Sequence, residues 1–228
     1  MRGVSVLDVS DLCIDLDCTP LLTNISFQIA PGTITGLYGD SGCGKTTLAL
    51  ALLRLLHPAR YRVRGSIRLD GQDLLSLPPR ELQRIRGAKI SMIFQDPLLA
   101  LNPVMRVRRQ VEEVLRAHAC RASLDSLFAM AGLPAEPRIL NAYPHQLSGG
   151  ERQRVGIAQA LACRPALMIA DEPFTALDVI RVVELAALFH DLKEKTGTSF
   201  LLITHSPGVL KALADSTLFM ERGRIDVH

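Results

Sequence analysis

The chain has 228 residues, of which 48% are apolar and 21% charged, and its formal net charge is +3. This composition excludes a disordered chain, and so small a charge does not indicate nucleic-acid binding. No apolar run reaches the roughly 18 residues that a membrane-spanning helix needs, and the N-terminus lacks the pattern of a secretory signal. We therefore expect a globular chain in the cytoplasm.

The first predicted elements are strands. Residues 4–38 alternate short apolar stretches with polar turns, and residues 61–75 repeat this style around Asp70-Gly71, a pair typical of a hairpin turn. Within the first stretch, residues 33–38 are apolar enough for a buried strand. These patterns predict a small antiparallel sheet beside a parallel one.

The stretch after residue 38 matches the phosphate-binding pattern G-x-x-x-x-G-K-[ST] without a mismatch. The matching residues are Gly39, Asp40, Ser41, Gly42, Cys43, Gly44, Lys45 and Thr46, followed by Thr47. The glycines leave backbone N–H groups bare for phosphate oxygens, and a helix predicted over residues 46–56 adds its dipole. Lys45 can then reach the β- and γ-phosphates, and the Thr46 hydroxyl can serve as a Mg²⁺ ligand.

The middle of the chain is predicted to be mostly helical. A polar helix is expected over residues 78–87, and residues 88–94 form a second buried-strand candidate that ends at Gln95. Beyond it, apolar residues recur at helical spacing and strand character is lost. We expect residues 97–157 to form a helical lobe inserted into one nucleotide-binding core made of residues 1–96 and 158–228.

The core resumes after this lobe. Residues 166–172 and 199–205 are continuous apolar runs typical of central parallel strands, residues 182–192 look helical, and residues 217–220 are expected to form the last strand. The expected fold class is α/β, with a parallel or mixed core sheet, a small antiparallel β subdomain and the helical lobe. Asp171 and Glu172 end one of these runs, and His205 ends another.

A second anion-binding pattern lies at residues 147–154. Ser148 followed by Glu151 is a capping box, so a helix should begin there. Gly149 and Gly150 would expose bare N–H groups in its first turn, at a cost of about 1 kcal/mol for each glycine inside a helix. That cost favours an anion-binding role over a purely structural cap.

In this order the motifs resemble the ATP-binding subunit of an ABC transporter over nearly the whole chain. Gly39–Thr46 is similar to the family's first nucleotide loop, and Asp171-Glu172 to its second nucleotide motif. The remaining matches are the glutamine loop at Gln95, the signature motif at Leu147–Gln153, the dimer loop at Ala176–Asp178 and the switch histidine at His205.

The resemblance implies ATP and Mg²⁺ as cofactors and a role for each matching residue. Asp171 would hold Mg²⁺ through water, and Glu172 would be the general base for the attacking water. Gln95 would sense both Mg²⁺ and that water, and His205 would contact the γ-phosphate. An ordinary core histidine at a strand end is the alternative for His205.

The resemblance also implies partners. Each ATP would lie between Gly39–Thr47 of one subunit and Ser148–Gly150 of another, so one chain carries half of each site. A second ATPase subunit, in a heterodimer or a homodimer, and two membrane permease subunits are expected, with an extracytoplasmic binding protein as an indirect partner. The chain would lie at the cytoplasmic face of the inner membrane as a peripheral protein, and no nucleic-acid partner is expected.

Within the family, Phe94–Pro97, Ala100–Pro103 and Tyr143–Ser148 resemble the ATPases of peptide and nickel importers. Peptide-type members usually continue past the final strand, whereas the sequence stops at His228, which favours nickel or a metal chelate as cargo. A peptide importer is the alternative. A DNA- or ribosome-associated ATPase is less favoured, because no sustained heptads separate the nucleotide motifs and the chain carries one such domain.

Two groups of residues remain outside these motifs. The five cysteines are odd in number and scattered without a C-x-x-C pair, so we expect reduced thiols rather than disulfides or a zinc site. Arg106, Arg108 and Arg109 form a local basic group. We expect Glu112 and Glu113 to balance these charges on a solvated helix face.

Overall fold

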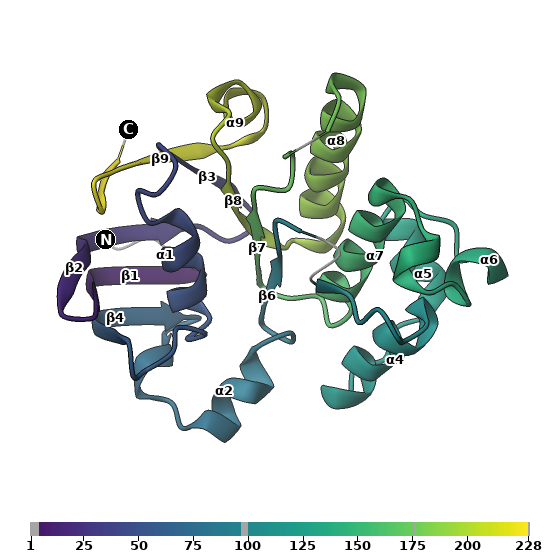
Figure 1. Cartoon of the computed structure of the whole chain (residues 1–228), viewed down its shortest axis with the longest axis horizontal. Helices are drawn as coiled ribbons and strands as arrows, with labels where there is room; N and C mark the ends of the chain where they lie inside the picture. Colours follow the sequence, from purple (N-terminus) through teal and green to yellow (C-terminus); the bar gives the residue numbers. More distant parts are fainter. Residues whose placement is uncertain (1–4, 97–99, 176, 228) are drawn as a thin grey trace.

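A computed structural model describes residues 5–96, 100–175 and 177–227 of the chain. Its first sheet is antiparallel, with four strands in the order β2-β1-β4-β5, and forms the purple and blue side of Figure 1. The strands are β1 (Leu7–Leu16), β2 (Thr19–Ile29), β4 (Tyr61–Leu69) and β5 (Gln72–Asp73). Asp70 and Gly71 join β4 to β5 with positive φ angles of 49° and 77°, which confirms the predicted hairpin turn.

The second sheet has six strands in the order β10-β9-β3-β8-β7-β6. All neighbours in it are parallel except β10, which is antiparallel to β9. The strands are β3 (Ile34–Tyr38), β6 (Ile90–Ile93), β7 (Leu167–Asp171), β8 (Ser199–Ile203), β9 (Ser216–Glu221) and β10 (Arg224–Val227). The predicted pairing of a parallel sheet with a small antiparallel one is therefore confirmed.

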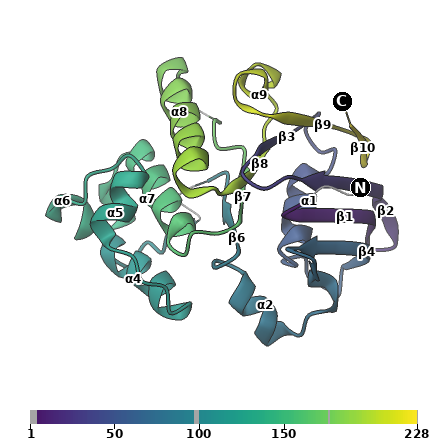
Figure 2. The same cartoon turned by 180° about the vertical axis from the view of Figure 1, so that it is seen from behind.

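The helices lie on both sides of the six-stranded sheet (Figures 1 and 2). They are α1 (Lys45–Leu52), α2 (Pro79–Ile85), α4 (Val107–Ala117), α5 (Leu124–Met130), α6 (Pro137–Leu140), α7 (Gly149–Leu161), α8 (Val179–Thr196) and α9 (Pro207–Leu213). Short 3₁₀ turns cover Leu74–Ser76 and Pro144–Gln146. Within the described ranges, no helix is long and apolar enough to cross a bilayer.

Strand alternation divides the core into two clusters. Leu167 and Ile169 of β7 point toward α1 and the antiparallel sheet, whereas Met168 and Ala170 point toward α7 and α8. Because both faces of β7 are covered, every residue of the strand is buried. Burial of both faces explains the continuous apolar run in the sequence. It also fixes the position of Asp171 at the end of the strand.

Four elements differ from the expectations. Helix α1 ends at Leu52 because Arg54 turns to φ 51° and its guanidinium donates to the Leu74 and Leu77 carbonyls. Helix α7 continues to Leu161, beyond the predicted end of the lobe at residue 157. Helix α9 and strand β10 were not predicted. The helix has 7 residues and the strand 4, so neither is long enough to show a clear apolar period.

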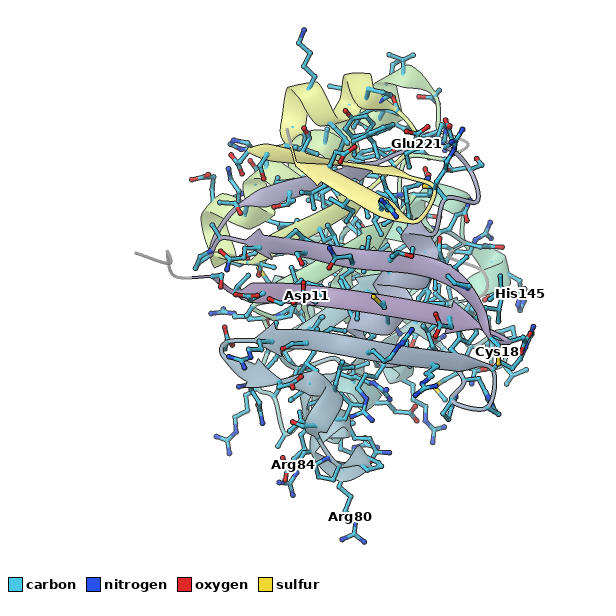
Figure 3. All side chains as sticks on the ribbon, turned by 90° about the vertical axis from the view of Figure 1, so that its left-hand side faces the viewer. Asp11, Cys18, Arg80, Arg84, His145 and Glu221 are labelled. Atoms are coloured by element: carbon cyan, nitrogen blue, oxygen red, sulfur yellow. A yellow bond between two sulfur atoms is a disulfide. The ribbon has the colours of Figure 1, made fainter. Side chains whose placement is uncertain are left out.

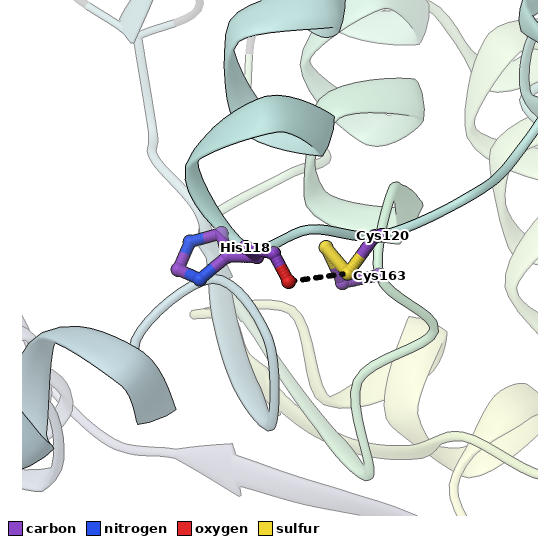
Figure 4. Close-up of a disulfide and its surroundings, with 3 residues drawn as sticks. All are labelled: His118, Cys120 and Cys163. Carbon is purple, nitrogen blue, oxygen red and sulfur yellow. Dashed lines mark hydrogen bonds between the residues drawn. A yellow bond between two sulfur atoms is a disulfide. The ribbon is translucent and has the colours of Figure 1, made fainter.

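The expectation that all five cysteines are free thiols is wrong. Cys120, in the α4–α5 loop, is joined by a disulfide to Cys163, just after α7 (Figure 4). The two cysteines are 43 residues apart, so no local spacing signals the pair, and the packing of α4 against α7 brings them together. Cys13, Cys18 and Cys43 are free.

Candidate functional site

The phosphate-binding pattern folds into a loop between β3 and α1. Gly39 and Gly44 have φ angles of 156° and 111°. A Cβ on Gly39 would collide with the Met220 carbonyl oxygen, and one on Gly44 with the Leu22 side chain, so this loop accepts only glycine at both positions. The loop leads directly into the N-terminus of α1, where unpaired N–H groups favour the binding of an anion.

Lys45, the first residue of α1, is 8% exposed. Its ammonium donates to the carbonyl oxygens of Gly39 and Asp40 at 2.7 and 2.9 Å and lies 3.8 Å from the Cys43 sulfur. Within the described residues no carboxylate forms an ion pair with it. The side chain thus holds a positive charge under the loop, available to a phosphate group.

Asp171 ends β7 beside the start of α1. It is 3% exposed, and its Oδ1 atom is buried without a hydrogen-bond partner among the described residues. Burial raises the pKa of Asp171, and a hydrogen bond from the Thr46 hydroxyl opposes this. A buried carboxylate oxygen with no partner, next to a hydroxyl, fits the oxygen ligands that Mg²⁺ prefers.

Glu172 follows Asp171 at a backbone φ of 49°, an uncommon conformation for a side chain of this size. Its Oε2 atom lies 2.8 Å from Nδ1 of His205 and 3.4 Å from the Thr175 hydroxyl. The Glu172 side chain is 13% exposed, whereas His205 is 62% exposed. His205 is therefore not a buried core histidine, and the structure pairs it with Glu172, the acid that follows the predicted metal ligand Asp171.

The signature segment forms the predicted capping box at the start of α7. The Ser148 hydroxyl accepts from the Glu151 N–H at 3.3 Å, and the Glu151 carboxylate accepts from the Ser148 N–H at 2.8 Å. Arg138 holds the other oxygen of that carboxylate. Gly149 and Gly150 form the start of the first turn of α7, and the anion-binding role expected of them stays a prediction.

Some of these residues line two separate hollows, whose walls include neither Asp171 nor His205. The first, of about 280 Å³, is walled by the phosphate-binding loop together with Gln95, Glu172 and Leu21. The second, of about 180 Å³, contains Gly149 and Gly150, and Gln95 also reaches it. The structure thus brings Gln95 and Glu172 to the phosphate-binding loop, whereas the signature glycines do not share its hollow.

Some of the lining residues were not found from the sequence. Leu21 of β2 borders the phosphate-binding loop, and Arg181 of α8 borders the signature glycines. No pattern marks either residue, because each reaches its hollow from an element distant in the sequence. Pro97, in the stretch that resembles peptide and nickel importers, and Ala176, in the predicted dimer loop, lie outside the described residues.

A side-chain hydrogen bond connects the two halves of the site. Gln153 of α7 donates from Nε2 to the carbonyl oxygen of Pro173 at 2.5 Å. Pro173 directly follows Glu172, and Gln153 is one turn along α7 from the signature glycines. The position of α7 is therefore tied to the segment that carries the acidic pair.

Comparison with known proteins identifies this arrangement. The family model described as ABC transporter matches residues 22–175. The chain belongs to the ABC transporter family. Its fold, an α/β core with a separate antiparallel sheet, is that of an ABC ATPase cassette. The dimeric structure of MJ0796, described as a bacterial ABC transporter cassette, matches with a TM-score of 0.82 and 27% identity over 96% of both chains. The cbiO1 structure from Clostridium perfringens matches with a TM-score of 0.82 and 25% identity, over 99% of this chain and 88% of that one.

Curated relatives of this ABC protein are named as transport ATP-binding proteins. It is 44% identical to the peptidoglycan transport protein YejF of Agrobacterium fabrum, over 89% of this chain and 38% of that one. It is 39% identical to the oligopeptide transport protein OppD of Bacillus subtilis over 99% of this chain, and 42% identical to OppD of Salmonella typhimurium over 96%. The chain spans 66% and 68% of those two relatives' lengths.

Proposed function

We propose that this chain is the ATP-hydrolysing subunit of an ABC importer. The observation that carries the proposal is the Glu172 carboxylate, which lines the hollow of the phosphate-binding loop and is held by His205 at 2.8 Å. A carboxylate fixed beside a phosphate site is placed to take a proton from a water that attacks the γ-phosphate. The relatives' names, all of ATP-binding proteins, support this assignment.

Each residue then has a task that follows from its position. The N–H groups of the glycine loop and the Lys45 ammonium would bind the β- and γ-phosphates. Glu172 would accept the proton from water, and His205 would hold that carboxylate and contact the γ-phosphate, while Gln95 would orient the water. Thr46 and Asp171 would hold Mg²⁺, which when bound would offset the negative charge of the phosphates.

A complete site requires a second subunit. Gly149 and Gly150 present bare N–H groups in a hollow separate from that of the phosphate-binding loop. We infer that Ser148–Gly150 closes on ATP held by the loop of a partner ATPase, either a second copy or a related chain. Hydrolysis would then alternate with closure and opening of the dimer.

A permease is the proposed membrane partner. A mainly apolar groove of about 260 Å³ lies between β6, α4 and α7, with Leu55 and Phe94 at its rim, 45% and 41% exposed. We infer that a cytoplasmic helix of the permease fills it, because Phe94 immediately precedes Gln95 and so connects the groove to the nucleotide hollow. This arrangement would keep the chain peripheral, at the cytoplasmic face of the membrane.

A peptide is the proposed cargo. The relatives named above transport oligopeptides or peptidoglycan according to their names, and none of these three is named for nickel. The expectation of nickel depended on where the given sequence ends, whereas the names of these relatives favour a peptide. Nickel therefore becomes the alternative.

The hydrolytic proposal is tested with Glu172→Gln, which keeps the hydrogen-bonding shape but removes the base. We expect ATP hydrolysis to fall by at least about 100-fold, with ATP still bound and dimers accumulating in size-exclusion chromatography. The matched control is Glu221→Gln, at the exposed end of β9 (Figure 3), which should hydrolyse ATP at the native rate. Normal turnover by Glu172→Gln would refute the assigned role.

The cargo is tested by uptake of labelled oligopeptide and labelled nickel in parallel. Cells that lack this gene would be complemented with the native chain or with Glu172→Gln. We expect only the native chain to restore peptide uptake, with nickel uptake unchanged. Restored nickel uptake without peptide uptake would reverse the order of the two cargo hypotheses.

A further inference from the structure

The outward side of α4 carries a hollow of about 430 Å³ that the proposed ATPase does not use. Four arginines and one glutamate line it, together with the segment around Tyr143: Arg106, Arg108, Arg109, Arg116 and Glu112. The opposite side of α4 contacts the core through Val107, Gln110 and Val111, which are all buried. The helical period therefore directs these arginines to solvent.

The expected solvated face is confirmed, because Arg106, Arg108 and Arg109 are all exposed, but among the described residues only Arg108 forms an ion pair with one of the two glutamates. Arg108 pairs with Glu112 at 3.9 Å, but both side chains are about half exposed, so the pair contributes little. Among the described residues, Arg109 and Arg116 form no ion pair, and neither does the exposed Glu113. The hollow is therefore strongly positive.

Hydrogen bonds from two buried residues of α4, Gln110 and Val107, hold the walls of this hollow. Gln110 is 5% exposed, and its amide donates to the carbonyl oxygens of Asn102 and Met105 at 3.0 and 2.8 Å. The Val107 N–H donates to the Ala142 carbonyl oxygen at 3.0 Å, which ties α4 to the segment that carries Tyr143. The arginines thus extend from a backbone that is already held in place, so binding a ligand there costs less conformational entropy.

We propose that this hollow binds a phosphate-bearing anion. Guanidinium groups offer paired donors that match phosphate oxygens, and four of them face a single carboxylate here. The Tyr143 ring already packs against Arg106 at 5.9 Å and His145 at 5.8 Å, so recognition rests on charge rather than on base stacking. Two sources share this chemistry: a phospholipid headgroup, beside which the 82%-exposed Val104 would meet acyl chains, and a free phosphorylated metabolite.

The test uses the full chain carrying Lys45→Ala, so that the phosphate-binding loop does not bind the probes. One arm measures co-sedimentation with vesicles of phosphatidylglycerol and phosphatidylcholine against phosphatidylcholine alone. The other arm measures binding of inorganic pyrophosphate by calorimetry. The test variant is Arg109→Gln with Arg116→Gln, and the matched control is Arg80→Gln with Arg84→Gln on α2, two arginines that point into solvent (Figure 3).

We expect the test variant to weaken binding at least about tenfold and the control to change it less than twofold. Loss confined to phosphatidylglycerol vesicles would identify a lipid headgroup, and loss of pyrophosphate binding would identify a soluble phosphate. Equal binding by both variants, or binding of neither probe, would overturn the proposal. ATP hydrolysis by the Arg109→Gln, Arg116→Gln variant with Lys45 intact should stay native, so this outcome is independent of the proposed function.

Discussion

Asp171 is 3% exposed and carries a carboxylate oxygen that finds no partner among the described residues. Burial raises its pKa, and the nearby Glu172 charge adds to this, while the Thr46 hydroxyl and the Lys45 ammonium oppose it. A buried charge with an unsatisfied oxygen lowers stability. Such a group is expected where a metal ion is to be bound.

The first prediction concerns this carboxylate. Asp171→Asn removes the buried charge at nearly constant shape, so without ATP or Mg²⁺ the variant should melt higher, by about 2–4 °C for a gain of ~1 kcal/mol. Mg²⁺-dependent ATP hydrolysis should be lost. Calorimetric scans at neutral pH, with the exposed Asp226→Asn as a control, measure the shift. A lower melting temperature for Asp171→Asn would contradict the argument.

The role of Glu172 was predictable from the sequence only in part. Its position after a buried strand and its match to the family motif predicted an acid next to a metal ligand. Its contact with His205, 33 residues away, depends on the β7–β8 pairing that places the two strand ends side by side. No spacing rule encodes that distance.

The start of helix α7 combines a cap with an ion pair. The pKa of Glu151 is lowered from its ordinary 4.5, mainly by the hydrogen bond from Arg138 and then by the Ser148 N–H. Because the folded state favours the charged carboxylate, the stabilisation is present above the ordinary pKa. It is lost as the pH falls through the lowered pKa.

The second prediction follows from this linkage. Glu151→Gln should reduce the free energy of unfolding by about 1 kcal/mol at pH 7, because the charged partner of Arg138 and of the helix N-terminus is removed. The difference from the native chain should shrink as the pH falls below 4.5. Urea unfolding at several pH values measures it, with the exposed Glu113→Gln as a control. A difference that does not change with pH would exclude the ionic contribution.

The Cys120–Cys163 disulfide links two distant parts of the chain and closes a loop that contains α5, α6 and α7. The signature glycines lie inside this loop, and Cys163 lies shortly before the core strand β7. For a sequence separation of 43 residues, the chain-entropy estimate of the stabilisation is about 4 kcal/mol. The disulfide can form only when α4 packs against α7, so it depends on the tertiary structure.

The third prediction tests the disulfide. Cys120→Ser should lower the melting temperature of the oxidised chain by about 8–16 °C, the shift that ~4 kcal/mol produces in a chain of this size. A reducing agent should lower the native chain to the same value and leave Cys120→Ser unchanged. Cys18→Ser, at an exposed free thiol, is the control. Native and variant chains that melt together without reductant would show free thiols, as the sequence predicted.

The sequence alone predicted the α/β class, the two sheets and the phosphate-binding loop. These features depend on residues adjacent along the chain: alternating apolar positions within one strand, glycines at fixed spacing, and a cap followed by a helix. Local sterics and hydrogen bonding determine these features, so they can be predicted from the sequence without knowledge of the packing.

Only the tertiary structure decided which distant groups meet. The Glu172–His205 contact, the Cys120–Cys163 disulfide and the hollow between α4 and Tyr143 each join residues from separate elements. Their distances are set by strand order and helix packing, which arise from burial of apolar surface over the whole chain rather than from any local spacing. Burial also decided that the Oδ1 atom of Asp171 is left without a hydrogen-bond partner among the described residues, the feature that best fits a metal site.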